Sequence, residues 1–388
     1  MGGVMKSFQI TTKVWFGAGA LDRLREIPWK RVFVVADPFV VQSGVIGQVT
    51  ERLAAAGASW EVFDKVVPDP PVETVAAGVG ALMAFGPEAL VAIGGGSALD
   101  TAKLIREFAG RLGEGKGAAH LAMVAIPTTS GTGSEATNIA VLTDAEKQVK
   151  LPITSDALLP DEAILETELV KSVPAGLVAD TGMDVFTHAV EAIVAKGRSD
   201  FSDALAEKAV GLVGRYLLRS WKDAGDGRAR ERMHSAACLA GMAFNAAGLG
   251  LNHGMAHAMG ARFHIPHGRA NALVLPVVLA YNAGLGPVGS GRPELSSAAR
   301  GYAKTAAILG LQSGCGELGT RSLIHWVKFM REEMGIPGCV RDLGKVSEGE
   351  WEAAIPEMSA AAVADRCTEG NPVPPSREDV AALYRASW

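Results

Sequence analysis

Long apolar stretches are absent from this sequence. No segment approaches the about 18 uninterrupted apolar residues that a membrane-spanning helix requires. The first residues, MGGVMKSFQITTKVWFG, contain no apolar run of roughly 7–15 residues such as a secretory signal needs. We therefore expect a soluble cytoplasmic protein that neither crosses nor binds a membrane.

Paired cysteines and a strong excess of one charge are missing as well. The four cysteines are scattered and form no CxxC motif, which fits a reducing compartment. The formal net charge is −5, with acidic and basic residues interspersed and no basic stripe of the kind that binds nucleic acid. A disulfide scaffold and a nucleic-acid partner are therefore not expected.

The length and the pattern of the chain predict two domains. It has 388 residues, and single hydrophobic cores stop growing near about 250–300 residues. Strand-like and helix-like segments alternate in the first part, whereas long helical patterns rich in Ala, Leu, Glu and Lys dominate the second, for example over residues 200–216. We predict an α/β domain over residues 1–172 and an all-helical domain over residues 173–388.

The alternation in the first domain predicts a Rossmann-like parallel sheet. The strand-like segments are residues 32–36, 60–66, 89–93 and 121–126, and helical segments cover residues 39–56 and the Ala-rich stretch that ends near residue 85. The run VFVVA at 32–36 is apolar throughout and rich in β-branched residues, as in a strand that is buried on both faces. Strands that alternate with helices form βαβ units, in which the strands are parallel.

Two loops at the ends of predicted strands have the composition of a phosphate site. The first, GGGS at 94–97, leads into a helix, so its backbone can approach a ligand closely and the helix N-terminus can attract an anion. The second, TTSGTGS at 128–134, consists of small or hydroxylated residues. Each alone could be an ordinary turn or a solvated loop. On one edge of a parallel sheet they together predict a nucleotide site, although neither matches GxGxxG or the P-loop.

Asp37, at the end of the first long strand, allows two interpretations. Its carboxylate could bond a ribose hydroxyl and repel a 2′-phosphate, which would favour NAD over NADP. It could instead cap a helix that begins at Pro38. Its position alone favours the cap.

Histidines are few and concentrated. The chain has eight, five of which fall at 188 and between 253 and 267. With a nearby aspartate they form the set Asp184, His188, His253, His257, His264 and His267. The first two members are four residues apart, as are the next two, so each pair shares one face of a helix. Imidazoles with one carboxylate suit Zn²⁺ or Fe²⁺, and such a metal beside a dinucleotide indicates hydride transfer to or from an alcohol or carbonyl.

Together the motifs resemble the iron-containing alcohol dehydrogenase family. The blocks GGGSALDTAK, IPTTSGTGSEAT, TGMDVFTHAVEA and LNHGMAHAMGARFHIPHGRANA follow one another in that order. The similarity extends from FGAGAL near residue 16 to NPVPPSREDVAALY at 371–384. It implies the dehydroquinate synthase-like/iron alcohol dehydrogenase architecture and a metal-dependent, NAD(H)-linked enzyme that acts on short primary alcohols and aldehydes.

The resemblance implies roles for particular residues. It implies the metal ligands Asp184, His188, His253 and His267, with Fe²⁺ as the ion and Zn²⁺ as the alternative. It implies His257 as a catalytic histidine close to the metal, and Phe244 as a further residue of the substrate pocket. The implied cofactor-binding residues are Asp37, Gly94, Gly95, Gly96, Ser97, Asp100, Thr128, Thr129, Thr132, Lys150 and Leu169.

A narrower resemblance concerns SDFSDALAEKAVGLV, GLGLNHGMAH and FHIPHGRANA, which look like the 1-propanol dehydrogenases of bacterial propanediol-utilisation systems. It implies 1-propanol and propionaldehyde as substrates, a homodimer or larger homo-oligomer, and enclosure in a bacterial microcompartment. His264 is part of the last of these motifs. It is either a residue of the substrate pocket or, as we favour, a structural residue. The alternatives are a glycerol dehydrogenase-like or dehydroquinate synthase-like enzyme, or a non-catalytic metal-binding microcompartment protein. The last should have lost a ligand or a cofactor glycine, and this chain has lost neither.

Overall fold

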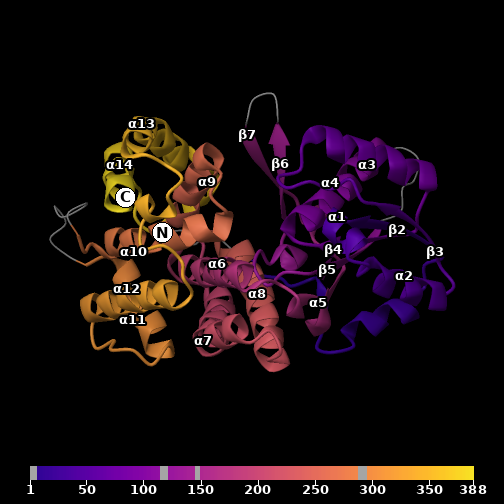
Figure 1. Ribbon diagram of the computed structural model, residues 1–388, viewed down its shortest axis with the longest axis horizontal. Coiled ribbons are helices and arrows are strands. Elements are labelled where there is room, and N and C mark those ends of the chain that lie inside the picture. Colours follow the sequence, from indigo (N-terminus) through magenta and orange to yellow (C-terminus); the bar gives the residue numbers. More distant parts are fainter. Residues whose placement is uncertain (1–6, 114–120, 145–148, 287–294) are drawn as a thin grey trace. The chain divides into compact units, whose positions relative to one another are not determined.

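The computed structural model describes residues 7–113, 121–144, 149–286 and 295–388. The chain divides into two units, Met1–Ser172 and Val173–Trp388. The first unit contains strands and helices, and the second contains helices (Figure 1). In the described parts of the chain, no helix combines the length and apolarity needed to cross a bilayer.

A parallel sheet forms the centre of the first unit (Figure 1). In spatial order its strands are β1 (Lys13–Phe16), β8 (Glu162–Leu165), β5 (Ala122–Pro127), β4 (Ala89–Gly94), β2 (Arg31–Ala36) and β3 (Ser59–Phe63). The predicted strands β2, β4 and β5 are confirmed, and β3 is shorter than predicted. The flanking strands β1 and β8 were not predicted.

Helices cover both faces of this sheet. They are α1 (Pro38–Gln42), α2 (Ile46–Ala55), α3 (Val72–Phe85), α4 (Gly96–Gly113) and α5 (Thr167–Lys171), with the 3₁₀ turns η1 (Ala20–Glu26), η2 (Ser134–Ala136) and η3 (Asp156–Leu158). Phe33 of β2 belongs to an apolar cluster with residues of α3 and α4. The next residue, Val34, belongs to a second cluster with residues of α2 and η1. Because alternate side chains are buried on opposite faces, β2 is apolar throughout.

The strand register brings three loops to one edge of the sheet. Ala36 of β2 pairs with Ile93 of β4, and Gly94 of β4 pairs with Pro127 of β5. From β2 the chain turns outward to β3 and returns on the other side of β2 to β4. The strand order therefore reverses between β2 and β4, and such a switch point is where open α/β sheets bind ligands.

Two local predictions for this unit need correction. The helix predicted over residues 39–56 is two helices, because Gly44 has a φ of 77°, a left-handed conformation that an α-helix cannot contain. An antiparallel hairpin, β6 (Ile139–Asp144) with β7 (Val149–Thr154), lies where no strands were predicted.

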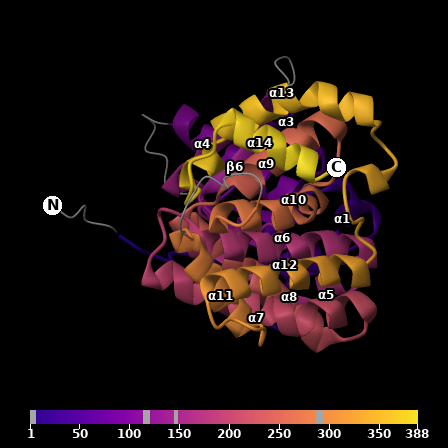
Figure 2. The same cartoon turned by 90° about the vertical axis from the view of Figure 1, so that its left-hand side faces the viewer.

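The second unit is helical throughout its described part, as predicted. Its helices are α6 (Ala175–Val194), α7 (Asp200–Lys222), α8 (Gly227–Ala247), α9 (Leu251–Phe263), α10 (His267–Ala283), α11 (Ser297–Ile308), α12 (Gly316–Glu333), α13 (Glu348–Ala364) and α14 (Arg377–Ala386), with the 3₁₀ turns η4 (Arg341–Leu343) and η5 (Arg366–Gly370). Helix α10 packs against α6, α9 and α12 (Figures 1 and 2). Ser199 begins α7 with a capping box, as Ser347 and Ser376 do for α13 and α14.

A buried arginine repairs a gap in the hydrogen bonds of α10. Pro276 lies inside this helix and has no N–H, so the carbonyl of Ala272 loses its helical donor. The guanidinium of Arg331, from α12, donates to the carbonyl oxygens of Ala272 at 3.1 Å and Leu273 at 3.2 Å. It also donates to the Gly338 carbonyl at 3.0 Å. Arg331 therefore ties α12 to the helix that carries His267.

We predict that Arg331→Met lowers the Tm by roughly 4–10 °C in calorimetry. The substitution keeps the aliphatic stem but leaves the buried carbonyl of Ala272 without a donor, at about 1–3 kcal/mol. The matched control is Arg321→Met on the same helix, because Arg321 is exposed and pairs with Glu317 on the surface of α12. Its Tm should change by less than about 2 °C. Equal shifts in the two variants would show that Arg331 does not support α10.

Candidate functional site

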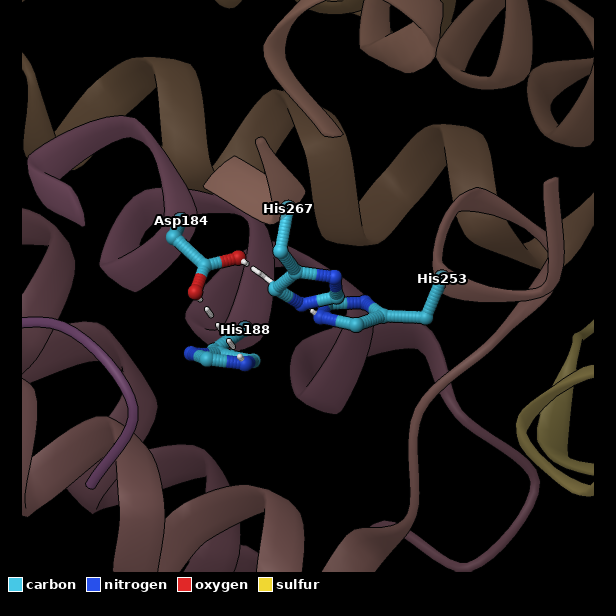
Figure 3. A group of neighbouring side chains, drawn as sticks. All are labelled: Asp184, His188, His253 and His267. Carbon is cyan, nitrogen blue, oxygen red and sulfur yellow. Dashed lines mark ion pairs between the residues drawn. The ribbon is translucent and has the colours of Figure 1, made fainter. Parts of the chain in front are cut away.

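Four side chains from three helices of the second unit converge (Figure 3). Asp184 and His188 come from α6, His253 from α9 and His267 from α10. One ligand-type atom of each lies within 4.8 Å of the others. Four tetrahedral ligands at about 2.1 Å from an ion lie about 3.4 Å apart, so the group has nearly the size of a metal site.

The distances to the carboxylate show how the group is arranged. The Oδ1 atom of Asp184 lies 3.5 Å from Nε2 of His267 and 3.8 Å from Nε2 of His253. Its Oδ2 atom lies 4.0 Å from Nε2 of His188. Three of the side chains are almost completely buried, whereas that of His267 is 42% exposed. The group is therefore open to solvent on the side of His267.

A glycine allows α10 to approach α6 at this point. A Cβ atom on Gly268 would lie 2.2 Å from the backbone oxygen of Asp180 and 3.3 Å from Cβ of Asp184. Any larger residue would push the two helices apart. His267, the residue just before Gly268, reaches Asp184 because position 268 has no side chain.

The protonation states of the group suit a divalent cation. Burial alone would raise the pKa of Asp184, but His188, His267, His253 and the amide of Asn271 hold it below its ordinary value. Burial, with the neighbouring imidazoles, keeps the pKa of His253 well below its usual value. An ionised carboxylate beside neutral imidazole is the state in which these residues bind metal.

Glu191 contacts His253 on the side away from the group. Its Oε2 atom lies 2.5 Å from Nδ1 of His253, and its Oε1 atom accepts the backbone N–H of Asn252 at 2.8 Å. Burial raises the pKa of Glu191 to about 8. In its ionised form the carboxylate accepts the Nδ1–H of His253 and leaves the Nε2 lone pair facing the group. Carboxylates take this position behind the histidine ligands of many metal sites.

Asn271 lies at the centre of the group. Its side-chain nitrogen donates to Asp184 Oδ1 at 2.7 Å and lies 3.2 Å from Nε2 of both His253 and His267. Its side-chain oxygen accepts from the amide of Asn252 at 2.8 Å. The two hydrogens of this amide face three acceptor atoms, so Asn271 cannot satisfy all three at once. A cation would satisfy the remaining acceptor, and we conclude that the donor set fits a metal ion.

His188 is held by ring contacts instead of a carboxylate. Its ring centroid lies 4.6 Å from that of Phe244 and 4.7 Å from that of His253. Its Nδ1 atom is buried, and no hydrogen-bond partner for it is found among the described residues. Phe244, at the end of α8, thus packs directly on one predicted ligand.

His257 and His264, the other two members of the predicted set, differ in their surroundings. The ring of His257 stacks on that of His267, with centroids 5.2 Å apart, and its Nδ1 atom lies 2.9 Å from Oδ2 of Asp365. His264 is exposed and has a φ of 54°, and its backbone N–H ends α9 by donating to Gly260. The position of His264 as a left-handed helix cap is a structural role.

At the sheet edge of the first unit, Asp37 serves as a helix cap and also contacts the glycine loop. Its Oδ1 atom accepts the backbone N–H of Val40 at 2.9 Å, which caps α1. Its Oδ2 atom accepts the N–H of Gly95 at 3.3 Å. A negative charge therefore lies directly beside the glycine loop.

The two predicted loops are joined to each other. The N–H of Thr128 donates to the carbonyl of Gly94 at 2.9 Å. A Cβ atom on Gly96 would lie 2.7 Å from the side chain of Thr132. The structure thus brings together the loops that follow β4 and β5.

Helix α4 holds the second loop in place through two polar residues, the half-buried Asp100 and the buried Lys103. Asp100 accepts from Ser134 Oγ at 2.7 Å and from the backbone N–H of Val141 at 3.0 Å. The Nζ atom of Lys103 donates to the carbonyls of Thr137 and Ile139, both at 2.9 Å. Burial lowers the pKa of Lys103 to about 8. Both carboxylate oxygens of Asp100 are thus bonded within the protein.

The remaining predicted cofactor residues lie in three places. Ser97 is in the first turn of α4, and Thr129 follows β5 in a half-buried position. Leu169 in α5 is 6% exposed and belongs to the apolar core beneath the sheet. Lys150 is in β7 opposite Thr143, and its side chain lies outside the described part of the structure.

Reasoning from the sequence missed Glu191, Asn271 and Asp365. Glu191 is three residues after His188 and Asn271 is four after His267, so helical spacing could have identified both. Asp365 is 108 residues from His257, and no local pattern signals that pair.

Known proteins match the chain over almost its whole length. Residues 11–167 match the iron-containing alcohol dehydrogenase family, and residues 178–388 match the C-terminal part of the Fe-containing alcohol dehydrogenase family. The 1-propanol dehydrogenase PduQ of Salmonella typhimurium is 39% identical, over 98% of this chain and 99% of that protein.

Two solved structures also resemble this one. An iron-containing alcohol dehydrogenase from Thermococcus thioreducens has a TM-score of 0.87 at 33% identity, covering 98% of this chain and 99% of its own. A sulfoacetaldehyde reductase from Bifidobacterium kashiwanohense, solved in complex with NAD⁺, has a TM-score of 0.84 at 27% identity, covering 99% of each chain.

We predict that Glu191→Gln weakens metal binding by about 10- to 100-fold, because the neutral amide no longer holds the Nδ1–H tautomer of His253. Titration of the metal-free protein with Fe²⁺ or Zn²⁺ against a competing chelator measures the change. Glu207→Gln, which alters a carboxylate paired with Lys304 elsewhere in the same unit, serves as the control. Unchanged affinity in Glu191→Gln would show that Glu191 does not support the ligand.

Proposed function

Because the chain belongs to the iron-containing alcohol dehydrogenase family, we propose that its preferred substrates are short primary alcohols and their aldehydes, above all 1-propanol and propionaldehyde. As a member of this family it is an NAD-linked alcohol dehydrogenase, which acts as an aldehyde reductase in the reverse direction. The observation that carries the proposal is the group of three imidazoles and one carboxylate that converge in the helical unit.

We propose Asp184, His188, His253 and His267 as the metal ligands. Three nitrogens and one oxygen suit Fe²⁺, with Zn²⁺ as the alternative. When bound, the ion polarises the substrate oxygen and stabilises the negative charge that develops on it. Glu191 and Asn271 fix the directions of the ligand atoms, and Phe244 packs on His188. The exposed side of His267 is where a substrate would enter.

NAD(H) would bind the first unit. The backbone at Gly94, Gly95 and Gly96, with Ser97 at the start of α4, would receive the pyrophosphate, since a helix N-terminus attracts anions. Thr128, Thr129, Thr132 and Lys150 belong to the same proposed site. Asp100 supports it by holding the second loop, and Leu169 by packing beneath it. Bound at these residues, the dinucleotide would supply or accept the hydride.

His257 would transfer the proton that accompanies the hydride. Its ring stacks on the proposed ligand His267, so it lies beside the metal group without belonging to it. In alcohol oxidation it accepts the hydroxyl proton, and in aldehyde reduction it returns one.

We further propose that the enzyme works in the cytoplasm as a homodimer or larger homo-oligomer, and inside a bacterial microcompartment where one is formed. The support is the similarity to a 1-propanol dehydrogenase over nearly the whole chain. The proposed domain roles follow the division of the chain, with residues 1–172 for the dinucleotide and residues 173–388 for metal and substrate.

The test combines metal analysis with a substrate series. Protein purified without oxygen is analysed for bound metal, and NADH consumption is followed with aldehydes of two to four carbons. We expect near-stoichiometric iron, the highest kcat/KM with propionaldehyde, and loss of activity with a chelator. If the active protein contains zinc instead of iron, zinc is the metal of the proposed site. Bound metal without turnover of any aldehyde or alcohol would contradict the function and favour a metal-binding protein.

A second test concerns the choice of dinucleotide. We predict that Asp37→Ser raises the ratio of kcat/KM for NADPH over NADH by about tenfold or more, because a carboxylate near a phosphate costs roughly 1–4 kcal/mol at about 4 Å. Serine still caps α1 and removes only the charge. Glu61→Gln, an exposed carboxylate of β3, is the control. An unchanged ratio would show that Asp37 does not take part in binding the cofactor.

A further inference from the structure

A second cluster of polar side chains adjoins the proposed metal group. One ring nitrogen of His257, one carboxylate oxygen of Asp365 and the sulfur of Cys367 lie within 4.8 Å of one another. Burial, followed by the charge of Asp365, raises the pKa of the Cys367 thiol well above its usual value, so the thiol stays protonated. Within this cluster, His257 and Asp365 are the hydrogen-bonded pair.

Both oxygens of Asp365 are engaged. The Oδ1 atom accepts the backbone N–H of Cys367 at 2.8 Å and caps η5, and the Oδ2 atom lies 2.9 Å from Nδ1 of His257. Thr368 fixes the turn from the other side by donating to the carbonyl of Ala362 at 2.6 Å. The carboxylate therefore has little freedom to turn away from His257.

The close approach of α9 to η5 depends on Gly254. A Cβ atom there would lie 2.1 Å from Oγ1 of Thr368 and 2.8 Å from the carbonyl of Ala362. Gly254 lies three residues before His257, so both are on the same face of α9. That face therefore packs tightly against the turn that holds the carboxylate.

We propose that Asp365 is a positioning residue for the reaction: it accepts the Nδ1–H of His257 and so leaves Nε2 as the proton-transferring nitrogen. This rests on the proposed function. Within the described residues, Asp365 is the only hydrogen-bond partner of the His257 ring.

The protons and electrons balance in this arrangement. In oxidation the alcohol O–H bond breaks and an Nε2–H bond forms on His257, while the hydride leaves carbon for NAD⁺. The products are the aldehyde, NADH and a protonated His257, which then loses its Nε2 proton to solvent. Asp365 stays ionised throughout and stabilises the protonated ring, as the aspartate does in a Ser-His-Asp triad.

Asp365→Asn tests the proposal with little change in shape. Asparagine can still cap η5, but it turns an NH₂ group towards Nδ1 and drives the ring proton to Nε2. We expect kcat to fall by about 100-fold or more, with KM for the aldehyde changed by less than about threefold and metal content unchanged. Asp365→Ser, which caps η5 without the carboxylate, should show the same loss.

Two further variants separate positioning from a purely structural role. His257→Ala combined with Asp365→Asn should lose no more activity than His257→Ala alone, because the two residues act as one unit. Glu357→Gln, an exposed carboxylate of α13, should keep wild-type kcat and Tm. Full kcat in Asp365→Asn with normal metal content, or additive losses in the double variant, would overturn the proposal.

The ring tautomer can be measured without turnover. In nitrogen-15 spectra of the zinc-loaded protein labelled at histidine, Nε2 of His257 should be unprotonated in the wild type and protonated in Asp365→Asn. An unprotonated Nδ1 in the wild type would overturn the proposal even if the enzyme is active. Absence of activity towards every alcohol and aldehyde, with the expected tautomer, would instead contradict the proposed function.

Discussion

The carboxylate of Asp184 is buried in the middle of the helical unit, with 4% of its side chain exposed. A buried negative charge is stable only where neighbours compensate it, so the packing of this unit must bring donors or cations to that point. Histidines from three helices and the amide of Asn271 do so. Gly268 permits the required distance between α6 and α10. Asn271 has two amide hydrogens for three acceptor atoms, and a cation at this point would be attracted by the acceptors it cannot satisfy.

Carboxylates in both units share one arrangement. One oxygen accepts a backbone N–H, and the other contacts a residue of the proposed site. Glu191 accepts the N–H of Asn252 and contacts the ring of His253. Asp365 caps the 3₁₀ turn η5 and contacts the ring of His257. Asp37 caps α1 and contacts the glycine loop. The hydrogen bond to the backbone fixes the carboxylate in the absence of a ligand, so the residue that it contacts is already oriented.

The sequence predicted the elements whose signals are local. The strands β2, β4 and β5 are buried on both faces and therefore apolar throughout, and Asp184 and His188 show helical spacing. The short strands β1 and β8 were missed because they pair with partners far along the chain: β1 pairs with β8. The hairpin β6–β7 was missed although its two strands are neighbours in the chain. The same limit applies to Asp365, whose role depends on a contact across 108 residues. The break at Gly44 was missed because a single glycine does not reveal its φ.

Pro276 and Arg331 have a consequence for how this sequence can vary. An ordinary residue at position 276 would reclaim the Ala272 carbonyl for the helix and leave the buried guanidinium with fewer acceptors. A shorter side chain at 331, with the proline retained, would leave that carbonyl without a donor. Each change is costly alone, and the costs largely cancel when both occur. The two positions are therefore expected to covary among relatives, and a chimera that exchanges α10 without α12 should fold poorly.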